Sequence, residues 1–169
     1  MGSAIHMYDY HTWAMSKTLQ HMQHLYKDIH NTSLHCIFPS ILNKVKQIYI
    51  VDHSWLDTLH GKSSFDVASQ TQRVIKETQH DDAEIIEAKM LKLSEEFRQI
   101  LKEDMNRKIL FMNTELNYMD IVQHMANHGT YRRGQITSML KQAGHNNTQT
   151  DYLLYLYLVN REHEELNTL

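Results

Sequence analysis

The sequence predicts an all-α fold: a four-helix bundle with an additional C-terminal helix. Two observations predict this class. Residues that break helices are scarce, since the chain of 169 residues contains 5 Gly and 1 Pro. Apolar side chains also recur at three- and four-residue spacing over long stretches, as helices with one buried face require. The length fits a single domain over residues 1–169, of which residues 1–3 resemble a remnant of cloning.

The first half of the chain contains two of the predicted bundle helices. Residues 5–29 carry an apolar stripe at helical spacing. The second helix begins at Pro39, which suits a first helical turn because no backbone donor is needed there. It ends at Gly61, a residue type that favours helix termination. We expect residues 62–69 to form a loop and residues 70–78 a short helix.

Acidic residues favour the positive end of a helix dipole, so Asp81 and Asp82 open the third long helix. Residues 107–116 then break the helical period. They predict either an irregular connection or a short β-hairpin.

The fourth helix begins after a capping signal formed by Asn117 and, three residues later, Asp120. Gly144 ends this helix. Residues 151–165 predict the additional C-terminal helix, which is rich in tyrosine and leucine.

Composition excludes several function classes. The net charge is −3 and the 17 Lys and Arg residues are dispersed, so direct nucleic-acid binding is not expected. No apolar run reaches the length of a membrane span, about 18 residues, and no signal-peptide pattern is present. We therefore expect a cytoplasmic protein without membrane contact. The lone Cys36 excludes an internal disulfide.

A polar stripe in the fourth helix carries the strongest functional signal. His124, His128 and Arg132 are spaced four residues apart and share one helix face with Ile121 and Ile136. This spacing predicts that the stripe points into the bundle. Buried imidazoles and a guanidinium are costly unless they are paired or bind something. A glycine at position 134, inside the same helix, suggests close approach of a neighbouring backbone.

Residues 127–135, Asn-His-Gly-Thr-Tyr-Arg-Arg-Gly-Gln, resemble the hallmark N-H-x-x-x-H-R-G-Q motif of the DinB family. Residues 9–14 are similar to the family's opening Y-x-x-W-A pattern. Residues 48–61 and 151–156 resemble its second and closing helices. The resemblance covers nearly the whole chain in the family's order and implies the DinB-like helical bundle.

The resemblance also implies a metal site of three inward-facing histidines, one from the second helix and two from the fourth. These positions are occupied here by Gln47, His128 and Arg132. Glutamine is a weak ligand for zinc or nickel, and arginine has no available lone pair and carries a fixed positive charge. The standard triad is therefore incomplete in this chain.

Three interpretations of these residues remain open. His124 and His128 could bind a divalent metal (Zn or Ni), with His53 or His11 as a third ligand, although His53 should face elsewhere. Alternatively, Gln47, His128 and Arg132 form a hydrogen-bonded network without any ion, in which Asp52 or Glu115 pairs Arg132. In a third interpretation Arg132 binds an anionic small molecule. The predicted pocket comprises Gln47, Trp55, His124, His128, Arg132 and Gln135.

Two classes of function follow from the resemblance. Members of the family include metal-dependent thiol transferases, isomerases and hydrolases, in which a metal would present a thiolate or water. The incomplete triad favours the other class, a small-ligand-binding or non-catalytic bundle, of the stress- or DNA-damage-inducible type that the family's name implies. The resemblance further implies a homodimer.

Overall fold

The computed structural model describes residues 3–25, 40–103, 107–111 and 113–167, with the side chains beyond residue 161 excluded. Within these ranges the chain forms six helices and one β-hairpin, which confirms the all-α class. The helices are α1 (Ser3–Gln23), α3 (Ile41–Leu59), α4 (Ser64–Glu77), α5 (Ala83–Glu103), α6 (Tyr118–Gln142) and α7 (Tyr152–Asn167). The strands are β1 (Lys108–Phe111) and β2 (Thr114–Asn117). None of these helices combines the length and apolar character that a membrane crossing needs.

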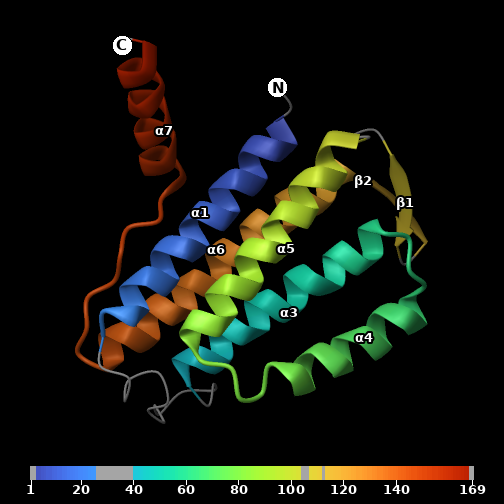
Figure 1. Cartoon of the computed structure of the whole chain (residues 1–169), viewed down its shortest axis with the longest axis horizontal. Helices are drawn as coiled ribbons and strands as arrows, with labels where there is room; N and C mark the ends of the chain where they lie inside the picture. Colours follow the sequence, from blue (N-terminus) through green and yellow to red (C-terminus); the bar gives the residue numbers. More distant parts are fainter. Residues whose placement is uncertain (1–2, 26–39, 104–106, 112, 168–169) are drawn as a thin grey trace.

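Helices α1, α3, α5 and α6 form the bundle. Each of them packs against two others, since α1 and α3 both contact α5 and α6. Figure 1 shows α1 and α6 running in one direction and α3 and α5 in the other. Helix α4 runs back along α3 and so connects two parallel bundle helices. The β-hairpin links α5 to α6 at one end of the bundle (Figure 1).

One continuous apolar cluster fills the bundle and contains side chains from α1, α3, α4, α5 and α6. Helix α7 contributes none of its buried members. Instead, Tyr155 of α7 packs in a second, smaller cluster with Tyr10, Ala14 and Ala126. The additional C-terminal helix therefore covers the outside of α1 and α6, and Figure 1 shows it standing beside the bundle.

Local signals set most helix ends as predicted. Asp82 accepts a hydrogen bond from the backbone of Ile85 at the start of α5. Gly61 follows the end of α3 with φ of +80°, a conformation that glycine adopts without strain. The hairpin alternative for residues 107–116 is confirmed, because β1 and β2 pair antiparallel in this stretch. Residues 26–39, including Cys36 and the proposed helix start at Pro39, lie outside the described residues.

Three predicted boundaries are wrong. The first helix is expected to reach residue 29, but α1 ends at Gln23, and residues 24 and 25 are not helical. The expected loop over residues 62–69 is mostly helical, because Ser63 caps α4 by accepting a hydrogen bond from the Asp66 backbone. Helix α3 begins at Ile41, since Ser40 is the N-cap and accepts a hydrogen bond from Asn43. At the starts of α3 and α4 a serine N-cap sets the boundary.

Candidate functional site

Arg132 links α6 to α3 at the positions where the family resemblance implies a metal. Its Nε donates to His128 Nε2 over 3.0 Å, and its NH1 donates to Gln47 Oε1 over 2.9 Å. This confirms the predicted network of Gln47, His128 and Arg132. Since His128 accepts through Nε2, its ring proton lies on Nδ1 and the imidazole is neutral.

Aromatic rings extend this network toward the hairpin. The rings of His124 and His128 stack with centroids 5.6 Å apart, and Trp55 meets His124 edge-on at 5.2 Å. Phe111 of β1 is the last ring of this row, and its centroid lies 5.1 Å from that of Trp55. Five of the six predicted pocket residues therefore lie together along the line where α3 meets α6.

Positive charge accumulates around Arg132. Burial lowers the pKa of His128, and the neighbouring charges of Arg132 and His124 lower it further. Burial also lowers the pKa of Lys44, with a second contribution from the charge of Arg132. Lys44 is only 2% exposed. Among the described residues no carboxylate lies within ion-pair distance of Arg132.

The two predicted acidic partners of Arg132 are both engaged elsewhere. Asp52 Oδ2 lies 2.9 Å from His11 Nε2, and Glu115 pairs with Lys108 across the hairpin. The prediction that one of them pairs Arg132 is therefore wrong. The Asp52 side chain meets α1, where the buried His11 is its hydrogen-bond partner.

The predicted stripe does not point into the bundle. His124 is exposed, and His128 and Arg132 are half-buried, whereas Gly129 and Arg133 are buried. The buried face of α6 passes through Met125, which lies about 100° around the helix from position 124. The polar stripe therefore lies at the rim of the core, where long side chains reach α3 and retain contact with water.

The buried arginine belongs to a second polar network. Arg133 NH2 donates to Tyr10 Oη over 3.2 Å and to Thr130 Oγ1 over 2.9 Å. Its Nε and NH1 have no partner among the described residues, and neither does His11 Nδ1 nearby. A Cβ added to Gly129 would lie 2.5 Å from the His11 ring and 2.9 Å from Arg133. Gly129 thus gives these buried side chains the space they occupy.

Sequence reasoning missed this second network. Arg133 recurs at helical spacing with Ala126, Gly129 and Ile136, so tracing the buried stripe of α6 from its apolar members would have found it. Instead, the glycine expected to permit close packing was Gly134. Nothing lies within 4 Å of a Cβ built there, so that prediction is wrong.

The other predicted residues are dispersed. His11 is buried against Asp52, and His53 Nδ1 lies 3.4 Å from Asp57 Oδ2 on its own helix. Neither joins His124 and His128, so the expectation of a third histidine ligand fails for both. Gln135 is half-buried, and its Oε1 accepts no hydrogen bond from the described residues.

The residues at the implied metal positions do not fit a metal ion. The Nε2 lone pair of His128 is taken by Arg132, and a fixed positive charge stands where a ligand should be. No group of three or more His, Cys, Asp or Glu side chains in the described part of the chain has a metal-binding arrangement. The site is a polar network centred on the Arg132 guanidinium, which no carboxylate of the described residues pairs.

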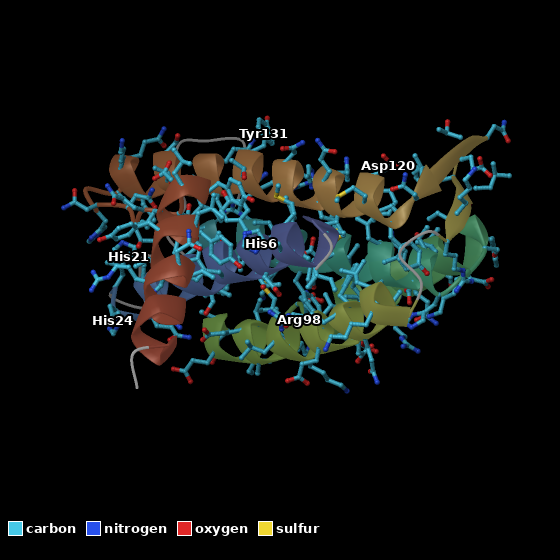
Figure 2. The ribbon with its side chains drawn as sticks, turned by 90° about the horizontal axis from the view of Figure 1, so that it is seen from above. His6, His21, His24, Arg98, Asp120 and Tyr131 are labelled. Carbon is cyan, nitrogen blue, oxygen red and sulfur yellow. The ribbon has the colours of Figure 1, made fainter. Side chains whose placement is uncertain are left out.

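A small cavity lies between α1 and α5 and reaches the buried pair of His11 and Asp52. Its volume is about 30 Å³, enough for one or two water molecules. Arg98 of α5 donates hydrogen bonds to Asp9 and Thr12 of α1; Figure 2 marks its position on α5. The cavity suits water that serves the buried polar pair.

The whole sequence was also compared with known proteins. The family model described as DinB family matches residues 1–165. Protein DinB of Bacillus subtilis (strain 168) is 32% identical over 166 residues, which cover 94% of this chain and 96% of that protein. No solved structure matches the chain significantly. Both matches span the bundle and the network around Arg132.

Proposed function

We propose that this chain, which belongs to the DinB family, binds a small anionic molecule at a site where Arg132 replaces the family's metal. The observation that carries the proposal is the pair of hydrogen bonds from Arg132 to His128 and Gln47. A guanidinium fixed between two helices provides a permanent cation at the centre of the site. Such a site suits the binding of an anionic molecule. It lacks the metal-coordinating side chains that metal-dependent chemistry requires.

The charge balance supports an anionic ligand. Arg132 has no carboxylate partner among the described residues, and Lys44 is close enough for the Arg132 charge to lower its pKa. A unit negative charge about 4 Å from the guanidinium gains about 4 kcal/mol at an effective dielectric near 20. Nε and NH1 of Arg132 donate to His128 and Gln47, so NH2 is the nitrogen left to donate to a carboxylate or phosphate oxygen.

Metal analysis tests the first half of the proposal. The wild-type protein, loaded with Zn, Ni or Mn and then dialysed, should retain almost no metal. The double variant Gln47→His/Arg132→His should retain a near-stoichiometric amount, because three histidines then converge where the guanidinium now lies. Gln47→His alone is the matched control, since it adds an imidazole while Arg132 stays in place.

Stoichiometric metal in the wild type, lost in His128→Ala, would overturn the proposal. The protein would then be a metal-dependent thiol transferase or hydrolase with a rearranged site at His124 and His128, and thiol transfer would be the activity to assay.

Anion binding tests the second half. Inorganic phosphate should raise the midpoint of thermal unfolding in a concentration-dependent way, because a ligand that binds only the folded state stabilises it. Arg132→Gln should abolish the rise while retaining a hydrogen-bonding side chain of similar reach. An equal rise in both proteins would show that phosphate acts elsewhere.

Other expectations from the family are part of the same proposal. A homodimer is expected and is measured by light scattering of the purified chain. Induction by DNA damage is expected from the family's name and is measured as transcript level in the source organism. Cytoplasmic localisation is expected and is tested by cell fractionation.

A further inference from the structure

A groove on the opposite side of α6 from Arg132 has the chemistry of a second binding site. It has a volume of about 450 Å³ and lies between α1, α6 and the segment that leads into α7. Its lining includes Tyr10, Asn127, Thr130, Arg133, Gly134 and Tyr152. This volume is within the range typical of small-molecule sites, roughly 300–1,000 Å³.

Gly134 has no structural role that the described part of the chain reveals. It lies inside α6, where glycine costs about 1 kcal/mol relative to alanine. A Cβ at this position would meet no atom within 4 Å, and φ at Gly134 is not positive. Packing and backbone conformation therefore do not require glycine. Because Gly134 lines the groove, its missing side chain keeps this part of the groove open.

Arg133, next in the chain, gives the groove a buried positive charge. The side chain is only 4% exposed, and within the described residues no carboxylate pairs with it and two of its nitrogens have no partner. Its NH2 contacts two hydroxyl oxygens, those of Tyr10 and Thr130. A carboxylate entering beside Thr130 would replace this neutral acceptor with a charged one, and charge-assisted hydrogen bonds are about twice as strong.

Aromatic rings form the apolar part of the groove. Tyr10 and Tyr152 both line it and meet edge-to-face, with centroids 4.9 Å apart. His6 lies beside them between α1 and α7, 5.3 Å from the ring of Tyr155, and Figure 2 shows it facing α7. A flat apolar body would pack against such rings.

Asp151 adds a negative charge to the lining of the groove and forms no ion pair with a described residue. This carboxylate opposes a second negative charge on any ligand. The groove therefore favours a monoanion over a dianion.

We propose that the groove between α1, α6 and the start of α7 binds a small aromatic monocarboxylate, whose carboxylate pairs with Arg133 and whose ring occupies the space left by Gly134. This inference does not rest on the function proposed for the Arg132 site, because the two arginines face different helices.

A titration of the full-length protein with benzoate, followed by amide NMR, tests the inference. Benzoate should produce saturable shifts at Thr130, Gly134 and Asp151 with millimolar affinity. Gly134→Leu should weaken binding by at least about tenfold, because the added side chain fills the groove. The variant should fold, since a Cβ at this position meets nothing.

Ser138→Leu is the matched control. It adds the same bulk one turn further along α6, at an exposed residue outside the groove, and should leave benzoate binding unchanged. Benzyl alcohol, which has the ring without the charge, should bind at least about tenfold more weakly than benzoate if Arg133 supplies the attraction.

Three results would overturn the inference. The first is the absence of saturable shifts with benzoate in the wild type. The second is undiminished binding in Gly134→Leu, which would place the ligand elsewhere. The third is equal binding of benzyl alcohol and benzoate, which would remove Arg133 from recognition.

Discussion

Arg132 and Arg133 are neighbours in the chain and have opposite environments. One residue is a rotation of about 100° around a helix, so adjacent side chains face different partners. Arg132 is half-buried against α3; it bonds Gln47 of α3 and His128 of its own helix. Arg133 is buried against α1; it bonds Tyr10 of α1 and Thr130 of its own helix. The two guanidiniums thus define two separate polar sites on one helix.

The two glycines near these arginines should respond oppositely to alanine. Gly129→Ala should destabilise the fold by about 1–3 kcal/mol, because the new Cβ overlaps the His11 ring in a packed interior. Gly134→Ala should be neutral or stabilise by up to about 1 kcal/mol, because it gains helix propensity and meets no atom. Urea unfolding of both variants measures the difference. Equal effects would show that Gly129 and His11 are not in contact.

The pH dependence of stability should report the neutral state of His128. Its pKa is lowered in the folded protein by burial and by the charge of Arg132, so the unfolded chain takes up a proton at higher pH. Its contribution to stability is therefore fully present above about pH 6.5 and is lost as the pH falls toward the folded pKa. Wild type should lose more stability than His128→Gln between pH 7.5 and pH 5, measured by urea unfolding. Glutamine still offers Arg132 a hydrogen-bond acceptor but does not titrate. An equal loss of stability in both proteins over this pH range would contradict this role of His128.

Short polar caps determine where the helices of this protein begin. At α6 the Asn117 side chain accepts from the Asp120 backbone, and the Asp120 carboxylate accepts from the Asn117 backbone. This capping box confirms the predicted start of the helix that carries both arginines. It also joins α6 directly to β2, so the hairpin and the helix share one boundary. Figure 2 shows Asp120 at this junction.

Removal of this cap should destabilise the whole bundle. Asn117→Ala should reduce the free energy of unfolding by about 1 kcal/mol, because the backbone N–H of Asp120 loses the Asn117 side chain as its acceptor. Asn117→Asp should be close to neutral, since aspartate is an equally good cap. Chemical denaturation compares the three proteins. If Asn117→Asp lost as much stability as Asn117→Ala, the amide group of Asn117 and not its capping hydrogen bond would account for the effect.

At the scale of the molecule, the core and the C-terminal helix are separate units of packing. Buried side chains of the main cluster come from α1, α3, α4, α5 and α6. Helix α7 attaches through tyrosines, and Tyr155 is only 6% exposed beside Tyr10. Since Tyr10 also donates to the Thr150 carbonyl and accepts from Arg133, α7 and the buried arginine share a partner.

Deletion of residues 146–169 should therefore leave a folded bundle. We expect cooperative thermal unfolding to persist, with a stability loss of about 2–4 kcal/mol from the exposed aromatic surface. Circular dichroism follows the transition, and the emission of Trp13, which packs against Tyr155 at 5.4 Å, should shift to longer wavelength. Tyr155→Ala in the full chain is the control for lost packing alone. A truncated chain without a cooperative transition would make α7 part of the core.

The sequence by itself determined the fold class, most of the helix order and the polar stripe of His124, His128 and Arg132. These features follow from local signals: apolar periodicity, acidic residues at helix starts, the Asn117 cap, and four-residue spacing in the fourth helix. Where a local signal was overlooked, as at Ser63, the boundary was wrong although the information lay in the sequence. By contrast, no local signal connects Gln47 with His128 and Arg132. These residues could be matched only through the family's motif.

Only the tertiary structure decided which side chains meet across helices. Helical spacing fixes the angle between His128 and Arg133 on α6 but does not say which neighbouring helix covers each face. For that reason the sequence offered Asp52 or Glu115 as a partner of Arg132, whereas in the folded bundle Asp52 pairs with His11 of α1 and Arg133 is buried instead. The same packing placed Gly129, and not Gly134, at the close contact, because distances between helices depend on every side chain in the interface.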